Sequence, residues 1–164
     1  VRLQHLQTMA NVLEVRLRKR LREDLGGVYS VSVGQSTDQF PAETYYVTIR
    51  FGCDPQRVDE LIAETEIIVA NLLVEPPTEE EMATAREQDL QGREEIVTSN
   101  TFWVGNLSST LLRQEDPLEL LHYTDRVNNR TAEDIHQMAN RVFQDNRTGS
   151  VILIHLPENM KPTE

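Results

Sequence analysis

The feature that most constrains this chain is an apolar stripe that stops at a pair of glycines. Apolar side chains recur every three or four residues from the start, as on one face of an amphipathic helix: Leu3, Leu6, Ala10, Leu13, Leu17 and Leu21. Gly26–Gly27 can adopt the positive φ angles that end a helix. Residues 28–33 and 45–51 then alternate in polarity. We therefore expect a helix, a strand ending at Gly34, a polar loop over 35–43 and a second strand.

Start and stop signals divide most of the remaining chain into helices. Asp54-Pro55 and Asp116-Pro117 each combine an N-cap acid with proline at the first helical position. Thr78–Glu81 has the pattern of a capping box and opens a long acidic helix towards Thr98, in which we expect Asp89 and Arg93 to pair at i,i+4. The other boundaries are a stop at Pro76-Pro77, a break near Ser99-Asn100 and a start at Thr131–Asp134.

These elements predict an α+β fold with an antiparallel or mixed sheet covered by several helices. Residues 151–154 form a continuous apolar run, which is typical of a strand covered on both faces. Such a strand needs neighbours, so we expect further strands of this sheet before residue 1. The predicted organisation is one partial domain over residues 1–157, followed by a polar tail over 158–164.

The composition of the chain argues against several classes of function. The 164 residues match one ordinary domain, and a net charge of −11 disfavours binding to phosphate backbones. No apolar run approaches the ~20 residues of a membrane helix. The single cysteine, Cys53, excludes an internal disulfide and a cysteine-rich zinc site, and it is compatible with either a periplasm or a cytoplasm. The charge is also uneven: residues 1–23 carry a net +4, whereas 57–95 carry −9, as expected of a solvated helical surface.

The basic end of the first predicted helix is the main candidate site. Arg18, Arg20 and Arg22 precede the glycine pair, and Tyr29 follows it on the first strand. A guanidinium and a phenol are hydrogen-bond donors suited to a peptide carbonyl or an oxyanion. Neither is a base or a nucleophile at neutral pH, so the pair would assist chemistry performed elsewhere. The alternative for each arginine is a solvated basic helix end.

Other chemically capable residues favour structural roles. His122 and Asp125 lack a second histidine at helical spacing, which favours a surface contact over a metal site. Cys53 has no histidine partner in the sequence and is expected to be buried as a small apolar residue. Phe102 and Trp103 are expected in the core or at a domain interface.

The residues around the candidate site resemble a known family. Residues 21–31, LREDLGGVYSV, are similar to the C-terminal, zinc-free half of pitrilysin or insulinase-type zinc peptidases, the inverted zincins with an H-x-x-E-H motif. In that family an L-R-E helix end precedes a Gly and a Tyr-Ser strand, with Arg and Tyr seven residues apart, as Arg22 and Tyr29 are here. The resemblance continues through the landmarks at 54–55, 76–81, 102–103 and 131–135. The bacterial branch, with G-G-x-Y, is the most similar.

The resemblance implies a function for the candidate pair. In the family, two related α+β halves enclose a proteolytic chamber; the N-terminal half holds zinc and activates water. Arg22 and Tyr29 would then bind the substrate peptide and stabilise the tetrahedral intermediate. This sequence contains no H-x-x-E-H motif. The resemblance therefore implies no metal on this chain, an inactive isolated chain, and zinc in an N-terminal half that acts as its partner. A homodimer is left open.

Two other functions are compatible with the sequence. The same family contains scaffold and regulatory subunits without zinc, so a non-catalytic scaffold domain is the first alternative. The second is an acidic module that binds peptides at an exposed sheet edge. An H-x-x-E-H motif upstream of Val1 would support the processing-type metallopeptidase, and its absence would support the scaffold.

Overall fold

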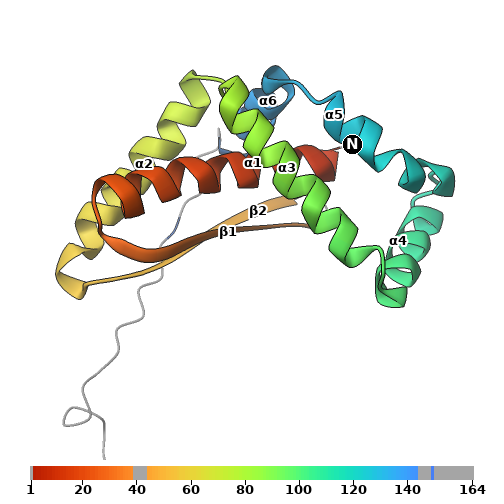
Figure 1. The fold of residues 1–164 in the computed structure, drawn as a ribbon, viewed down its shortest axis with the longest axis horizontal. Coiled ribbons are helices and arrows are strands. Elements are labelled where there is room, and N and C mark those ends of the chain that lie inside the picture. Colours follow the sequence, from red (N-terminus) through yellow and green to blue (C-terminus); the bar gives the residue numbers. More distant parts are fainter. Residues whose placement is uncertain (1, 39–43, 144–148, 150–164) are drawn as a thin grey trace, which may run out of the picture.

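The computed structural model describes residues 2–38, 44–143 and 149 (Figure 1). The chain begins with α1 (Arg2–Leu17) and η1 (Arg18–Asp24), followed by β1 (Val28–Asp38) and β2 (Thr44–Cys53). A short turn, η2 (Pro55–Arg57), leads into α2 (Val58–Val74), which precedes α3 (Glu79–Ile96). The remaining elements are α4 (Asn100–Leu112), η3 (Pro117–His122), α5 (Tyr123–Asn128) and α6 (Ala132–Phe143). The predicted strand at 151–154 lies outside the described residues.

The central element is α1, which packs against β1 on one side and against α2, α3 and α6 on the others (Figure 1). Four residues of the predicted stripe are fully buried on α1, and Met9 and Val12 are fully buried as well; the four are Leu6, Ala10, Leu13 and Leu17. The buried surface is wider than a single stripe because elements surround the helix. A helix packed on one face of a two-stranded antiparallel sheet confirms the predicted α+β class.

The hairpin differs from the sequence prediction in the length of its first strand. Instead of ending at Gly34, β1 continues to Asp38, and residues 35–37 pair with Val47, Tyr46 and Tyr45 of β2. The prediction of a loop from residue 35 was therefore wrong. Although residues 35–37 are polar, backbone hydrogen bonds to β2 hold them in the strand. Gln35 Nε2 also donates to Gln7 Oε1 on α1 at 2.6 Å.

Local capping signals are confirmed. Thr78 and Glu81 form the predicted capping box, with Thr78 N donating to Glu81 Oε2 at 2.8 Å and Glu81 N to Thr78 Oγ1 at 3.2 Å. Asp54 and Asp116 cap the turns that follow them, each of which starts as a 3-10 helix. Among the described elements, no helix has the length and apolar character needed to cross a membrane.

One predicted ion pair is wrong. Asp89 does not pair with Arg93; it is buried and bonds to residues of other helices. The Arg93 guanidinium instead lies over the rings of Phe102 and Tyr123, 4.4 and 4.7 Å from their centroids, and donates to Leu120 O at 2.9 Å. Tertiary packing prevails over the i,i+4 preference because that preference contributes only about 0.2–0.5 kcal/mol. Arg93 thus connects α3 to the segment α4–η3–α5.

Candidate functional site

The candidate site begins at the unusual end of the first helix. Residues 18–24, η1, form a π-helix rather than a continuation of the α-helix. A wide turn is rare and is found often at functional sites. Leu25 N donates to Arg20 O at 3.1 Å, and Gly27 N donates to Leu21 O at 2.8 Å, which closes the helix. The sequence pattern predicted the stop but not the change of helix type.

Both glycines of the stop are required by the structure. Gly26 has a φ of 56°, which favours glycine. A Cβ atom on Gly27 would lie 2.6 Å from Cδ2 of Leu61, so α2 packs directly against the backbone at this point. Arg57 Nη1 also donates to Leu25 O at 3.3 Å. Contacts from η2 and α2 therefore hold the segment between Arg22 and the start of β1 in place.

Ion pairs distinguish Arg22 from its basic neighbours. Arg18 Nη2 lies 2.6 Å from Glu14 Oε1, and Arg20 Nε lies 2.9 Å from Glu64 Oε2. Arg22 is exposed, and among the described residues no hydrogen bond or ion pair engages its guanidinium. The expected alternative is a solvated basic helix end; Arg18 and Arg20 are partly exposed, but each is paired with a carboxylate. Among the described residues, the five donors of Arg22 are left for another molecule.

A β-bulge exposes Tyr29 on the strand that follows. Val28 pairs with Cys53 and Val31 with Phe51, so two residues of β1, Tyr29 and Ser30, oppose only Gly52. The side chain of Tyr29 is 89% exposed, although the strand around it packs on α1. Bulges of this kind re-aim side chains and are enriched beside active sites. The structure thus presents the Tyr29 phenol at the start of the sheet, a few residues after the closed helix end.

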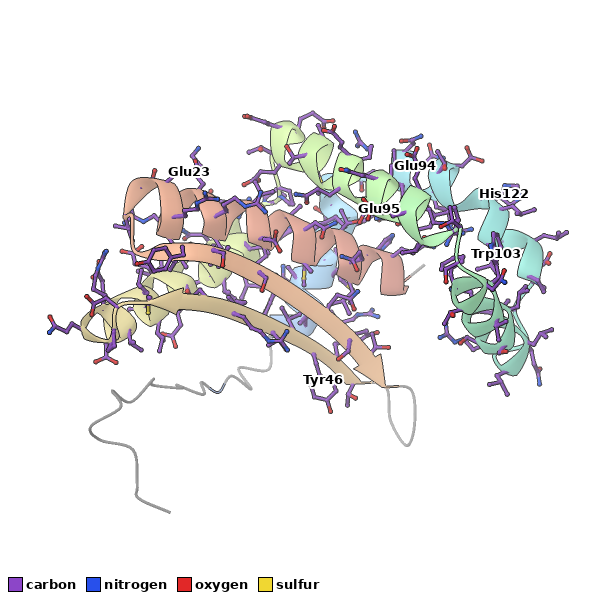
Figure 2. All side chains as sticks on the ribbon, turned by 60° about the horizontal axis from the view of Figure 1, so that its bottom comes forward. Glu23, Tyr46, Glu94, Glu95, Trp103 and His122 are labelled. Carbon is purple, nitrogen blue, oxygen red and sulfur yellow. The ribbon has the colours of Figure 1, made fainter. Side chains whose placement is uncertain are left out.

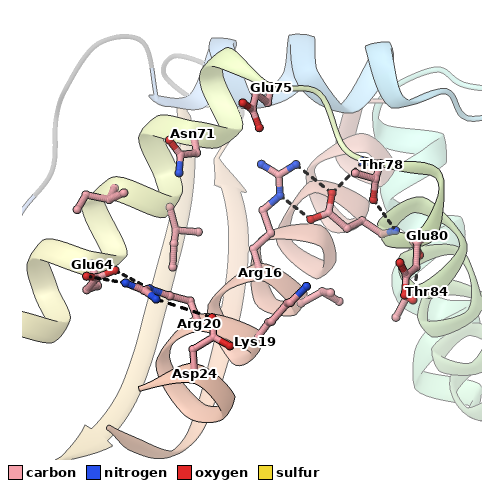
Figure 3. Close-up of a pocket in the computed structure, with 14 residues that line it drawn as sticks. Arg16, Lys19, Arg20, Asp24, Glu64, Asn71, Glu75, Thr78, Glu80 and Thr84 are labelled. Atoms are coloured by element: carbon pink, nitrogen blue, oxygen red, sulfur yellow. Dashed lines mark hydrogen bonds and ion pairs between the residues drawn. The ribbon is translucent and has the colours of Figure 1, made fainter. Parts of the chain in front are cut away.

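A groove on the helical side is lined by two arginines that are already paired with carboxylates. It has a volume of about 670 Å³ and lies between α1–η1, α2 and the start of α3 (Figure 3). Arg16 forms a bidentate pair with Glu81, with Nε–Oε1 at 2.7 Å and Nη2–Oε2 at 2.9 Å. Arg20 bonds both carboxylate oxygens of Glu64, at 2.9 and 3.1 Å (Figure 3). These pairs connect helices, so we assign the groove a structural role.

Glu81 makes this groove sensitive to pH. Burial acts to raise the pKa of its carboxyl, but hydrogen bonds from Arg16 and Thr78 outweigh burial and hold the pKa below the ordinary 4.5. A lowered folded pKa stabilises the fold above the unfolded pKa, and that stabilisation is lost as the pH falls through the folded value. Glu81→Gln should therefore lower the free energy of unfolding at pH 7 by about 1–2 kcal/mol.

The deficit of Glu81→Gln relative to the wild type should begin to shrink below about pH 4.5, where the carboxyl of the unfolded chain takes up a proton, and should vanish as the pH falls through the lower pKa of the folded state. Urea unfolding at pH 7 and pH 3.5 measures both differences. Glu80→Gln is the matched control, because this exposed neighbour on the same turn loses the same charge and should shift stability by only a few tenths of a kcal/mol. An equal deficit of Glu81→Gln at both pH values would contradict the assignment.

A buried polar cluster is the part of the molecule that sequence reasoning missed. Arg130 Nη1 lies 2.8 Å from Asp89 Oδ2, and the two side chains are only 2% and 1% exposed. Asn11 Nδ2 donates to Asp89 Oδ1 at 2.8 Å, and the Thr8 hydroxyl also donates to this carboxylate. Burial raises the pKa of Asp89 and lowers that of Arg130. The cluster connects α1, α3 and the segment between α5 and α6, on the covered side of the sheet.

The remaining sequence candidates have structural roles. His122 Nδ1 lies 3.7 Å from Asp125 Oδ2, and both side chains are exposed, as a surface contact requires. Cys53 is half-buried beside the core. Trp103 is half-buried, donates from Nε1 to Val97 O at 2.8 Å and packs edge-on against Phe102. Figure 2 shows Trp103 and His122 in the α4–α5 region, apart from the hairpin.

The described residues contain no metal centre. No group of three or more His, Cys, Asp or Glu side chains lies close enough within residues 2–38 and 44–143 to hold an ion. Arg22 and Tyr29 are donors rather than metal ligands or bases. The chemistry that the exposed pair can perform on its own is hydrogen bonding to a carbonyl or an oxyanion.

The chain is similar to known proteins in both sequence and fold. The sequence model of the family described as the peptidase M16 inactive domain matches residues 2–88, more than half of the chain. No curated protein matches significantly. Among solved structures, the periplasmic protease PqqL from Escherichia coli is similar with a TM-score of 0.68 and 20% identity, over 87% of this chain and 16% of that chain.

Two further solved structures share the fold. A peptidase M16 inactive domain from Pseudomonas fluorescens has a TM-score of 0.68 and 19% identity, over 85% of this chain and 34% of that one. A mutant of the ferredoxin protease FusC, in complex with Arabidopsis ferredoxin, has a TM-score of 0.65 and 18% identity, over 85% and 15%. The chain thus spans about a third or less of the length of these proteins. The resemblance stated from residues 21–31 is confirmed, and the chain belongs to the peptidase M16 family, as its inactive C-terminal domain.

Proposed function

We propose that this chain is the zinc-free C-terminal domain of a zinc metalloendopeptidase, in which Arg22 and Tyr29 bind the substrate peptide and stabilise the tetrahedral intermediate. The observation that carries the proposal is the exposure of the pair. Arg22 has no partner among the described residues, and the bulge opposite Gly52 presents Tyr29 to solvent. Both flank a helix stop that α2 holds in place.

The proposed chemistry needs only donation of hydrogen bonds. During hydrolysis, the carbonyl oxygen of the scissile peptide bond gains negative charge, and bonds to a charged guanidinium and to a phenol strengthen as that charge develops. Both donors keep their protons throughout. The zinc-bearing half of the same polypeptide would activate the attacking water. One donor to an oxyanion is worth about 10²–10³ in kcat.

The relatives support a bacterial proteolytic parent. PqqL is described as a periplasmic protease and FusC as a ferredoxin protease bound to its ferredoxin, and both are several times longer than this chain. By analogy, we propose that the parent of this chain acts on polypeptides, in the periplasm or the cytoplasm of a bacterium. A scaffold role in the same family is the second candidate, because the matching family model describes an inactive domain.

Metal removal from the polypeptide that carries this chain tests the proposal. The full polypeptide should hydrolyse unstructured peptides, lose that activity on treatment with a chelator and regain it with zinc. The 164-residue chain alone should bind no stoichiometric zinc and cleave no casein. Absence of hydrolysis by the metal-loaded full polypeptide would overturn the peptidase assignment and favour the scaffold.

A further inference from the structure

One face of the hairpin is uncovered in the described structure. Alternate residues of β2 are exposed, and the helices pack on the other side. Figure 2 shows Tyr46 on the side of the hairpin away from the helices. We call this surface the open sheet face; the exposed residues at the end near the bulge are Tyr29, Ser32, Thr48, Arg50 and Gly52.

The open sheet face differs from the rest of the protein in charge. Arg50 is the only charged side chain that the structure describes on it, whereas the whole chain has a net charge of −11. Within the described ranges, no hydrogen bond or ion pair engages the Arg50 guanidinium, although several other arginines pair with a carboxylate. The surface therefore offers an unneutralised guanidinium among hydroxyl groups and glycine. Its charge complements a carboxylate.

The register places Arg50 beside the proposed oxyanion donor. Arg50 pairs with Ser32, and the next position on this face of β2 is Gly52, which opposes the bulge that carries Tyr29. A Cβ atom on Gly52 would meet nothing within 4 Å, so no side chain separates the two residues there. Two residues along a strand span about 7 Å. A peptide extended along β2 with its carbonyl at Tyr29 therefore brings a side chain about two residues away to Arg50.

We propose that Arg50 is a specificity-determining residue that selects peptides with a glutamate or aspartate about two residues from the carbonyl held at Tyr29. This inference rests on the proposed function, since it requires a peptide on the open sheet face. A guanidinium binds a carboxylate through two parallel hydrogen bonds, which a neutral glutamine cannot match. The selection is electrostatic and therefore weakens with salt.

Matched peptides test the inference on the 164-residue chain. Two ten-residue peptides of identical sequence carry either Glu or Gln at the central position, and their Kd values are measured by nuclear magnetic resonance titration of the labelled chain. The Glu peptide should bind about five- to tenfold more tightly at low salt, with shifts in β1 and β2. Arg50→Gln should bring the ratio of the two Kd values to about one.

Arg113→Gln is the matched control. Arg113 is another exposed arginine that follows α4, so its replacement removes the same net charge far from the hairpin. The Kd ratio should stay at five to ten in this variant; an equal loss in both variants would overturn a local role for Arg50. Equal binding of the two peptides to the wild type would overturn the inference alone. Failure of both peptides to bind would overturn both the inference and peptide binding by this domain.

Discussion

Replacing Tyr29 by phenylalanine in the full polypeptide should lower kcat/KM for peptide hydrolysis about 100- to 1000-fold, the loss found when one oxyanion donor is removed. The variant removes a single hydroxyl. Because the ring is 89% exposed and packs against nothing that the fold needs, the stability of the domain should not change. The loss should appear in kcat, because the hydrogen bond strengthens only as charge develops on the carbonyl oxygen.

Tyr46→Phe is the control for this result. Tyr46 is also exposed and lies on β2, the other strand of the hairpin, but it pairs with Ser36 at the far end from the bulge. Removing its hydroxyl should change kcat/KM by less than about twofold. Full activity of Tyr29→Phe would remove Tyr29 from the mechanism, and an equal loss in both variants would indicate a general effect on the sheet.

The second large effect concerns stability. Asp89→Asn should lower the free energy of unfolding by about 3–5 kcal/mol, because it leaves the Arg130 charge buried without its counterion. Urea unfolding of the 164-residue chain measures this free energy. The urea concentration at the midpoint should fall, while the m value, the slope of the free energy against urea concentration, stays constant. Combining Asp89→Asn with Arg130→Met should cost less than the sum of the single variants, since the double variant has no unpaired charge.

Asp125→Asn provides the comparison. Asp125 is a carboxylate with an exposed side chain, 3.7 Å from His122, and its replacement should change stability by less than about 0.5 kcal/mol. A loss below 1 kcal/mol in Asp89→Asn would show that the buried pair does not stabilise the fold. Additive single losses would show that the two residues act independently.

The parts of the fold that depend on local chemistry could be predicted from the sequence. The capping box at Thr78 and Glu81 and the stop at Gly26–Gly27 each depend on residues within a few positions of one another. The same holds for the alternation of β2. In these cases, the local structure is determined by hydrogen bonds to the nearby backbone or by the periodicity of the side chains, and it does not depend on which elements pack against it.

The parts that depend on distant partners could not be predicted. Asp89 bonds to Asn11 and Arg130, which lie 78 and 41 residues away in the sequence, so its sequence neighbour Arg93 was the natural but wrong partner. The extension of β1 beyond Gly34 depends on pairing with β2. The sequence gives no sign of these contacts, because each depends on how elements meet in space.

The candidate site was predicted in part. The spacing of Arg22 and Tyr29 was visible, but three of their properties required the structure: the π-helical turn, the neutralisation of Arg18 and Arg20 by Glu14 and Glu64, and the bulge. Arg50 was not identified from the sequence, although its place in the alternating strand was a usable signal. An isolated arginine on a polar strand face indicates a site only once the covered side of the sheet is known.

In the proposed mechanism, Tyr29 binds the tetrahedral intermediate more tightly than it binds the substrate. This difference is measured by comparing the affinities of the full polypeptide, wild type and Tyr29→Phe, for a phosphinic peptide that mimics the intermediate and for the corresponding substrate peptide. In Tyr29→Phe, we expect affinity for the phosphinic peptide to fall by the same factor as kcat/KM, while affinity for the substrate changes less than about threefold. An equal fall for both ligands, or a fall for neither, would contradict this mechanism.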